Sequence, residues 1–148
     1  MARVSNREYR SRVLSLLETE VKLYHETVRR LKEGKEDIIY ERKSEPDSIN
    51  IKSPGVGDPT SKKAMAIYNS HEIANMGKTV RAIERAKDEF CQKEPGLRMR
   101  YIDLRFWDGK LTNAGIAAEL KMGESTVRTW RGKFLELVAM YLGWRLVP

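Results

Sequence analysis

The sequence predicts an all-α protein, and two patterns lead to that fold class. Two long stretches, one near the N-terminus and one in the centre, repeat apolar residues at the spacing of an amphipathic helix. A stretch near the C-terminus contains two shorter repeats of the same kind. The segment Asp47–Lys52 could be extended but lacks a visible partner strand, so no sheet is predicted.

The first predicted helix runs from Asn6 to about Glu33. Apolar residues recur along it in the heptad pattern of a coiled-coil seam, and Val13, Leu16 and Leu23 widen that seam into a broader face. The seam consists of Leu14, Leu17, Val21, Tyr24, Val28 and Leu31. The pattern leaves two alternatives open, which are packing against the central helix and dimerisation.

A loop or hinge is predicted at about residues 42–59, where proline, glycine and serine concentrate. A second long helix then runs from Thr60 to about Gln92, with Asp58 or Thr60 as its N-cap. Its repeating face consists of Ala66, Asn69, Ile73, Met76, Val80, Ile83 and Phe90. We expect this face to pack against the first helix.

Pro95 and Gly96 are expected to end the central helix, and Leu97–Trp107 to form the next one. The segment Lys110–Leu137 then predicts two helices joined by a tight turn. Thr112 is a good N-cap for the first of them.

Met122 and Gly123 suit the turn itself. Methionine can fill the angle between two helices, and glycine tolerates backbone angles that other residues resist. The second helix is expected to bury Val127, Trp130, Phe134, Leu137 or Val138, and Tyr141. Its outer face is therefore polar and basic at the start.

Such a helix start is suited to the major groove of DNA, because its dipole and free amides favour phosphate. Arg128 is the predicted guanine reader, since a guanidinium can bond both acceptors of a guanine edge. Serine and threonine side chains here could reach bases or phosphates. The neighbouring cations could contact phosphates, and the start of the first helix could contact the adjoining DNA backbone. The predicted DNA-binding residues are Thr112, Asn113, Glu124, Ser125, Arg128, Thr129, Arg131 and Lys133.

Charge and composition limit the classes of protein to which this chain could belong. The net charge of +7 favours an anionic partner and predicts salt-sensitive binding. Cys91 is a lone cysteine and the two histidines are scattered, so one chain offers neither a disulfide framework nor a Cys/His zinc site. No catalytic set stands out either, and we expect neither an enzyme nor a cofactor. The sequence has no membrane-spanning run and no signal peptide, which predicts a cytoplasmic protein.

Several short segments resemble the promoter-reading C-terminal domain of bacterial sigma factors. They are Tyr101-Ile-Asp-Leu-Arg-Phe-Trp, Leu111-Thr, Ile116-Ala, Leu120 and Ser125-Thr-Val-Arg. With Asp58-Pro-Thr and Lys63-Ala in the middle, the chain is similar to RinA-type phage late-transcription activators. It departs from sigma-like domains at Gly123, where they usually have a capping serine. The resemblance implies a phage-type activator of late genes in a bacterial host cell, with host RNA polymerase as a partner.

The expected organisation is a helical assembly or partner region at residues 1–94, followed by a sigma-like helix-turn-helix DNA-binding domain at residues 95–148. The predicted function is sequence-specific binding of double-stranded DNA in transcription regulation, with a homo-oligomer as a further possibility. Two alternatives remain. One is a small terminase-like DNA-packaging initiator, and the other is a helical adaptor without direct DNA binding.

Overall fold

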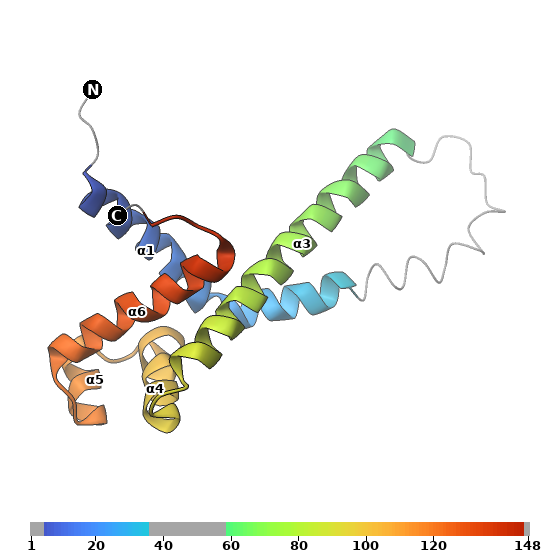
Figure 1. Cartoon of the computed structure of the whole chain (residues 1–148). Coiled ribbons are helices and arrows are strands. Elements are labelled where there is room, and N and C mark those ends of the chain that lie inside the picture. Colours follow the sequence, from blue (N-terminus) through green and yellow to red (C-terminus); the bar gives the residue numbers. More distant parts are fainter. Residues whose placement is uncertain (1–4, 36–58, 147–148) are drawn as a thin grey trace. The chain divides into compact units, whose positions relative to one another are not determined.

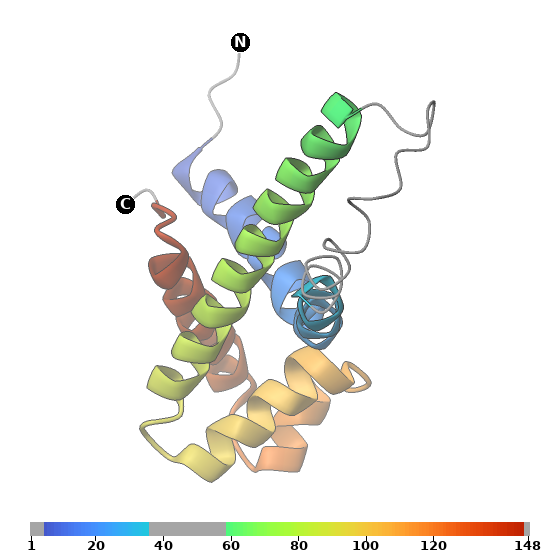
Figure 2. The ribbon, with the colours of Figure 1, turned by 90° about the vertical axis from the view of Figure 1, so that its right-hand side faces the viewer.

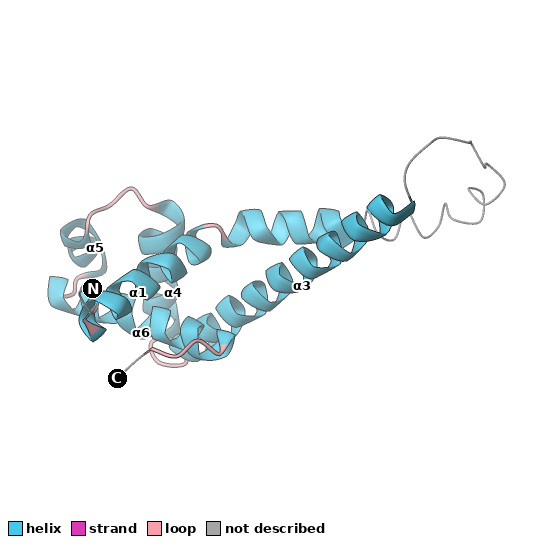
Figure 3. Cartoon of the chain, turned by 90° about the horizontal axis from the view of Figure 1, so that it is seen from above, coloured by secondary structure: helices cyan, strands magenta, loops and turns pink. Residues whose placement is uncertain are grey.

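The computed structural model describes residues 5–35 and 59–146, and every element in these ranges is a helix (Figures 1 and 3). The all-α prediction is therefore confirmed for this part of the chain. The elements are α1 (Asn6–Lys22), a helix at residues 24–35, α3 (Pro59–Phe90), α4 (Pro95–Ile102), the π-helical η1 (Asp103–Asp108), α5 (Asn113–Leu120) and α6 (Glu124–Leu142).

The predicted loop at about residues 42–59 lies outside the described residues, apart from Pro59, which begins α3. The proposed cap Asp58 and the segment Asp47–Lys52 lie outside them as well. Within the described ranges, no helix combines the length and the apolar character that crossing a membrane requires.

The chain forms two compact units. One contains Met1–Tyr24 and Arg81–Pro148, and the other contains His25–Val80. This division differs from a boundary at residue 94, because α1 and the end of α3 share one hydrophobic core with the C-terminal helices.

The predicted N-terminal helix is interrupted at Leu23, whose φ of −85° and ψ of 2° depart from helical values. The helix begins at an ordinary serine N-cap, because the Ser5 side chain accepts a hydrogen bond from the Glu8 amide at 3.1 Å. At its end, the Trp107 indole Nε1–H donates to the Val21 carbonyl at 3.1 Å. A side chain from η1 thus binds a backbone carbonyl next to the interruption.

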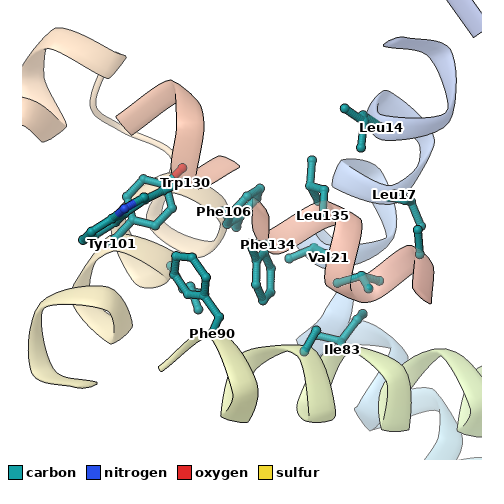
Figure 4. Packing of buried hydrophobic residues seen from close by; sticks show 14 of the residues in the cluster. Leu14, Leu17, Val21, Ile83, Phe90, Tyr101, Phe106, Trp130, Phe134 and Leu135 are labelled. Atoms are coloured by element: carbon teal, nitrogen blue, oxygen red, sulfur yellow. The ribbon is translucent and has the colours of Figure 1, made fainter. Parts of the chain in front are cut away.

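The core of the larger unit shows where the N-terminal half of the heptad seam packs. Leu14, Leu17 and Val21 of α1 are buried in the hydrophobic cluster that also contains Ile83 of α3, and Figure 4 labels these side chains. This half of the seam therefore packs within the chain. α1 makes its main contacts with α6 and η1, however, rather than with the central helix that the first alternative named, and α1 and α6 can be followed in Figure 2.

Five aromatic side chains form the other part of this core, and we call them the aromatic cluster. They are Phe90, Tyr101, Phe106, Trp130 and Phe134. The Trp130 ring meets Phe90 edge-on at 5.7 Å between centroids and Tyr101 edge-on at 5.4 Å. Such edge-to-face contacts stabilise a core beyond the burial of apolar area. The cluster joins the end of α3, α4, η1 and α6.

The predicted helix Leu97–Trp107 is observed as α4 followed by η1. Pro95 opens α4 because its fixed φ suits a first helical turn, so the proline and Gly96 start this helix as well as separating it from α3. Tyr101 and Phe106 are buried in the hydrophobic core that α5 and α6 share.

In the smaller unit, the helix at residues 24–35 approaches α3 closely at one glycine. A Cβ atom at Gly34 would lie 3.1 Å from the Ile73 side chain, so glycine permits this close contact. Ile73 belongs to the repeating face predicted for the central helix, and it is half-buried.

Candidate nucleic-acid interface

The first helix of the candidate site starts as predicted. Thr112 has extended backbone angles, and its Oγ1 accepts a hydrogen bond from the Gly115 amide at 3.1 Å. This bond satisfies one of the amides that a helix start leaves without an intrahelical partner. Asn113, the first residue of α5, is half-buried.

The turn between α5 and α6 consists of residues 121–123, and its backbone differs from the prediction. Lys121, rather than Gly123, takes the left-handed conformation, with φ of 56° and ψ of 48°. The amides of Lys121 and Met122 satisfy the carbonyls of Ala118 and Ala117 at the end of α5. Gly123 has a φ of −70° and is the N-cap of α6, a position that the sequence also allowed for it, and it supplies no side-chain hydrogen bond. Met122 packs against the hydrophobic core, as the sequence predicted.

One face of α6 is buried more widely than the sequence predicted. Val127, Trp130, Phe134 and Val138 are buried as expected, whereas Leu137 and Tyr141 are only partly buried. Leu135, Ala139 and Leu142 are buried in addition. The reason is that α6 is covered by α5 and also by α1.

The opposite face at the start of α6 is open to solvent. Its exposed side chains are Glu124, Ser125, Arg128, Thr129 and Lys133. The Arg128 side chain is 66% exposed, and its guanidinium lies 2.8 Å from Glu124 Oε1, one helical turn earlier. Exposed pairs of this kind are worth only about 0.3–0.5 kcal/mol. A guanine edge or a phosphate could therefore compete with Glu124 for the guanidinium.

The hydroxyl of Thr129 already donates to the Ser125 carbonyl at 2.9 Å. Its oxygen can still accept a bond, but its proton is engaged, which suits Thr129 to a weaker role than Arg128. Two exposed cations outside the predicted set, Lys110 and Lys121, lie at either end of α5. Their charge and their position in connecting segments are the only signals that the sequence carried for them.

Arg131 lies in a different environment from the other predicted residues. It donates a hydrogen bond to Glu18 Oε2 at 3.1 Å, and its side chain is 27% exposed. Arg105 of η1 forms an ion pair with the other oxygen of Glu18 at 2.7 Å. We call Glu18, Arg105 and Arg131 the ionic cluster. The structure thus places Arg131 toward α1, and its predicted phosphate contact would require it to leave Glu18.

Glu18 stays charged within this cluster. Burial alone would raise the pKa of Glu18, but the hydrogen bond from Arg131 and the positive charges of Arg105, Arg131 and Lys22 outweigh it. The pKa of this carboxyl therefore lies below its ordinary value.

The described residues contain no group of histidine, cysteine and acidic side chains that could hold a metal ion. Cys91 follows the end of α3, and burial raises the pKa of its thiol. No protein-family model, curated protein or solved structure matches the chain.

Proposed function

We propose that this protein is a sequence-specific transcription regulator that binds double-stranded DNA by placing the start of α6 in the major groove. One observation carries the proposal. The exposed, polar and basic start of α6 belongs to a helix whose other faces are buried against α5 and α1. Such a helix can meet base edges in a fixed orientation, without first becoming ordered.

In this proposal Arg128 reads guanine through a bidentate contact, and Lys133 binds a phosphate without regard to sequence. Ser125 and Thr129 add short-range contacts, and Glu124 releases Arg128 when DNA binds. Thr112 and Asn113 meet the DNA backbone from the start of α5.

The resemblance to phage activators extends the proposal. It supports a role in late-gene activation in a bacterial host cell, where the bound protein would contact host RNA polymerase.

The first test is selection of random duplex DNA by the full chain at moderate salt, followed by sequencing of the bound molecules. We expect enrichment of a motif that contains guanine. Arg128→Ala should relax the preference at one position and weaken binding of the best duplex by about 1–3 kcal/mol. Lys133→Ala should weaken all duplexes alike and lower the salt slope by about one.

Arg30 provides a matched control for Arg128. It forms the same kind of exposed pair one turn after a glutamate, at 3.2 Å from Glu26, and its side chain is 65% exposed. Arg30→Ala should leave DNA binding unchanged. Failure to enrich any duplex, or equal effects of the Arg30 and Arg128 variants, would contradict the proposal.

A further inference from the structure

The face of α1 that points away from the core carries an apolar stripe. Tyr9, Leu16 and Leu23 are 44%, 60% and 48% exposed, although large apolar side chains normally seek burial. They are spaced by seven residues, so the three side chains point in nearly the same direction along α1 and its C-cap. We call these three residues the outer stripe. The sequence predicted that Leu16 and Leu23 would widen the face of the heptad seam, but both are exposed, whereas the α1 residues of the seam itself are buried.

Two opposite charges flank the outer stripe symmetrically. Arg12 lies four residues before Leu16, and Glu20 lies four residues after it. At 3.6 residues per turn, each is displaced by about 40° from Leu16, on opposite sides of the stripe. Arg12 is exposed and Glu20 is half-buried. The sequence around Leu16 is therefore symmetric in its spacing. One apolar residue lies seven positions before Leu16 and another lies seven positions after it, and two opposite charges lie four positions before and after it.

We propose that the outer stripe is the docking surface for a second copy of this chain, with the two α1 helices antiparallel about a twofold axis at Leu16. In this arrangement Leu16 contacts Leu16 of the partner subunit. Tyr9 contacts Leu23 of the partner subunit, and Arg12 lies across from Glu20 of the partner subunit. Each of the last two contacts occurs twice, as twofold symmetry requires.

Charge complementarity favours a second copy of this chain on the outer stripe, and it favours an antiparallel over a parallel pair of α1 helices. A parallel pair would place Arg12 beside Arg12 of the partner subunit, which is unfavourable. The antiparallel pair instead gives each arginine a carboxylate. The intrahelical pair of Arg12 with Glu8 is exposed and weak, so it does not prevent this contact. The proposal does not depend on DNA binding.

The test is sedimentation equilibrium of the full chain without DNA, from low to high micromolar concentration. We expect a reversible monomer–dimer equilibrium. Leu16→Glu should raise the dissociation constant by about tenfold or more, because each dimer loses the apolar contact at its axis and gains two facing carboxylates. The control is Met140→Glu on α6, where a methionine that is 55% exposed lies outside the stripe. This control should leave the equilibrium unchanged, and circular dichroism should show the same helix content in both variants.

Charge reversal tests the direction of the pair. Arg12→Glu and Glu20→Arg should each weaken the dimer by about threefold, since each places like charges opposite one another twice. Mixing the two single variants should restore association, because every contact in the mixed dimer again joins opposite charges. Rescue by mixing is not expected from a variant that merely folds poorly.

Three results would overturn the inference. They are a monomer at every concentration, a dimer that tolerates Leu16→Glu, and single charge variants that associate no better when mixed.

Discussion

The aromatic cluster and the ionic cluster both hold α6, but they do so by different physical means. Trp130 and Phe134 join rings from α3, α4 and η1, and they are stabilised by burial and by edge-to-face contacts that require no charge. Arg131 is held by one carboxylate from α1, which it shares with Arg105. Apolar packing should therefore supply most of the stability of α6 at any pH. The ionic contact should fix α6 against α1 only while Glu18 is charged.

The largest expected effect is on the aromatic side. Phe134→Ala should lower the free energy of unfolding by about 3–5 kcal/mol, because a fully buried ring leaves a cavity among its neighbours. Chemical denaturation followed by circular dichroism measures this loss. Phe134→Leu, which keeps much of the apolar volume, should lose clearly less. A loss below about 1 kcal/mol for the alanine variant would show that the site collapses without cost.

On the ionic side, Glu18→Gln should lower the free energy of unfolding by about 2–4 kcal/mol. The glutamine leaves two arginines without their shared counterion, in an environment where Glu18 itself is only 15% exposed. Glu8→Gln on the same helix is the matched control, since Glu8 is 53% exposed in its pair with Arg12. The control should change stability by no more than about 0.5 kcal/mol. Equal losses in the two variants would mean that burial of the ionic cluster has no energetic consequence.

Lowering the pH should weaken the contribution of the ionic cluster and leave that of the aromatic cluster unchanged. The pKa of Glu18 is lower in the folded chain than its ordinary value of 4.5, so the folded state binds this proton less readily than the unfolded state. The contribution of Glu18 is therefore complete above about pH 4.5, and it is lost as the pH falls through the folded pKa. Urea unfolding of the natural chain and of Glu18→Gln should show a constant difference between pH 5 and 7, and a shrinking difference below. A difference that stays constant into acid would contradict the role of the charge.

The same contrast explains what the sequence could predict. The buried face of α6 and the Thr112 cap depend on residues within a few turns of one another, and periodicity indicated both. The same periodicity predicted the exposed residues of the candidate site, because they occupy the positions of α6 that do not belong to its buried face.

Contacts between distant segments were not predictable in this way. Glu18 and Arg131 are 113 residues apart, and Trp107 reaches Val21 across 86 residues. Because of the first contact, Arg131 binds Glu18 of α1 instead of being free for the predicted phosphate contact. The second contact lies where the N-terminal helix is interrupted. The conformation of Lys121 was missed for another reason. Glycine prefers the left-handed region but is not required there, so the presence of Gly123 did not fix which residue of the turn adopts it.

The smallest expected effect comes from the polar tie within the aromatic cluster. The Tyr101 hydroxyl donates to the Val127 carbonyl at 2.9 Å, and burial raises the pKa of this tyrosine, so the hydroxyl keeps its proton. Tyr101→Phe should cost about 1 kcal/mol, because a buried carbonyl in the first turns of α6 loses its side-chain donor. Tyr141→Phe is the control, since its hydroxyl bonds to the exposed Glu89, and it should cost no more than about 0.5 kcal/mol. The Tyr101 effect should be the same at pH 5 and pH 7 and should persist at pH 3.5, where the Glu18 effect shrinks, because its acceptor is a backbone carbonyl that does not titrate. A Tyr101 effect that follows the pH dependence of Glu18 would show that the two clusters hold α6 as one network.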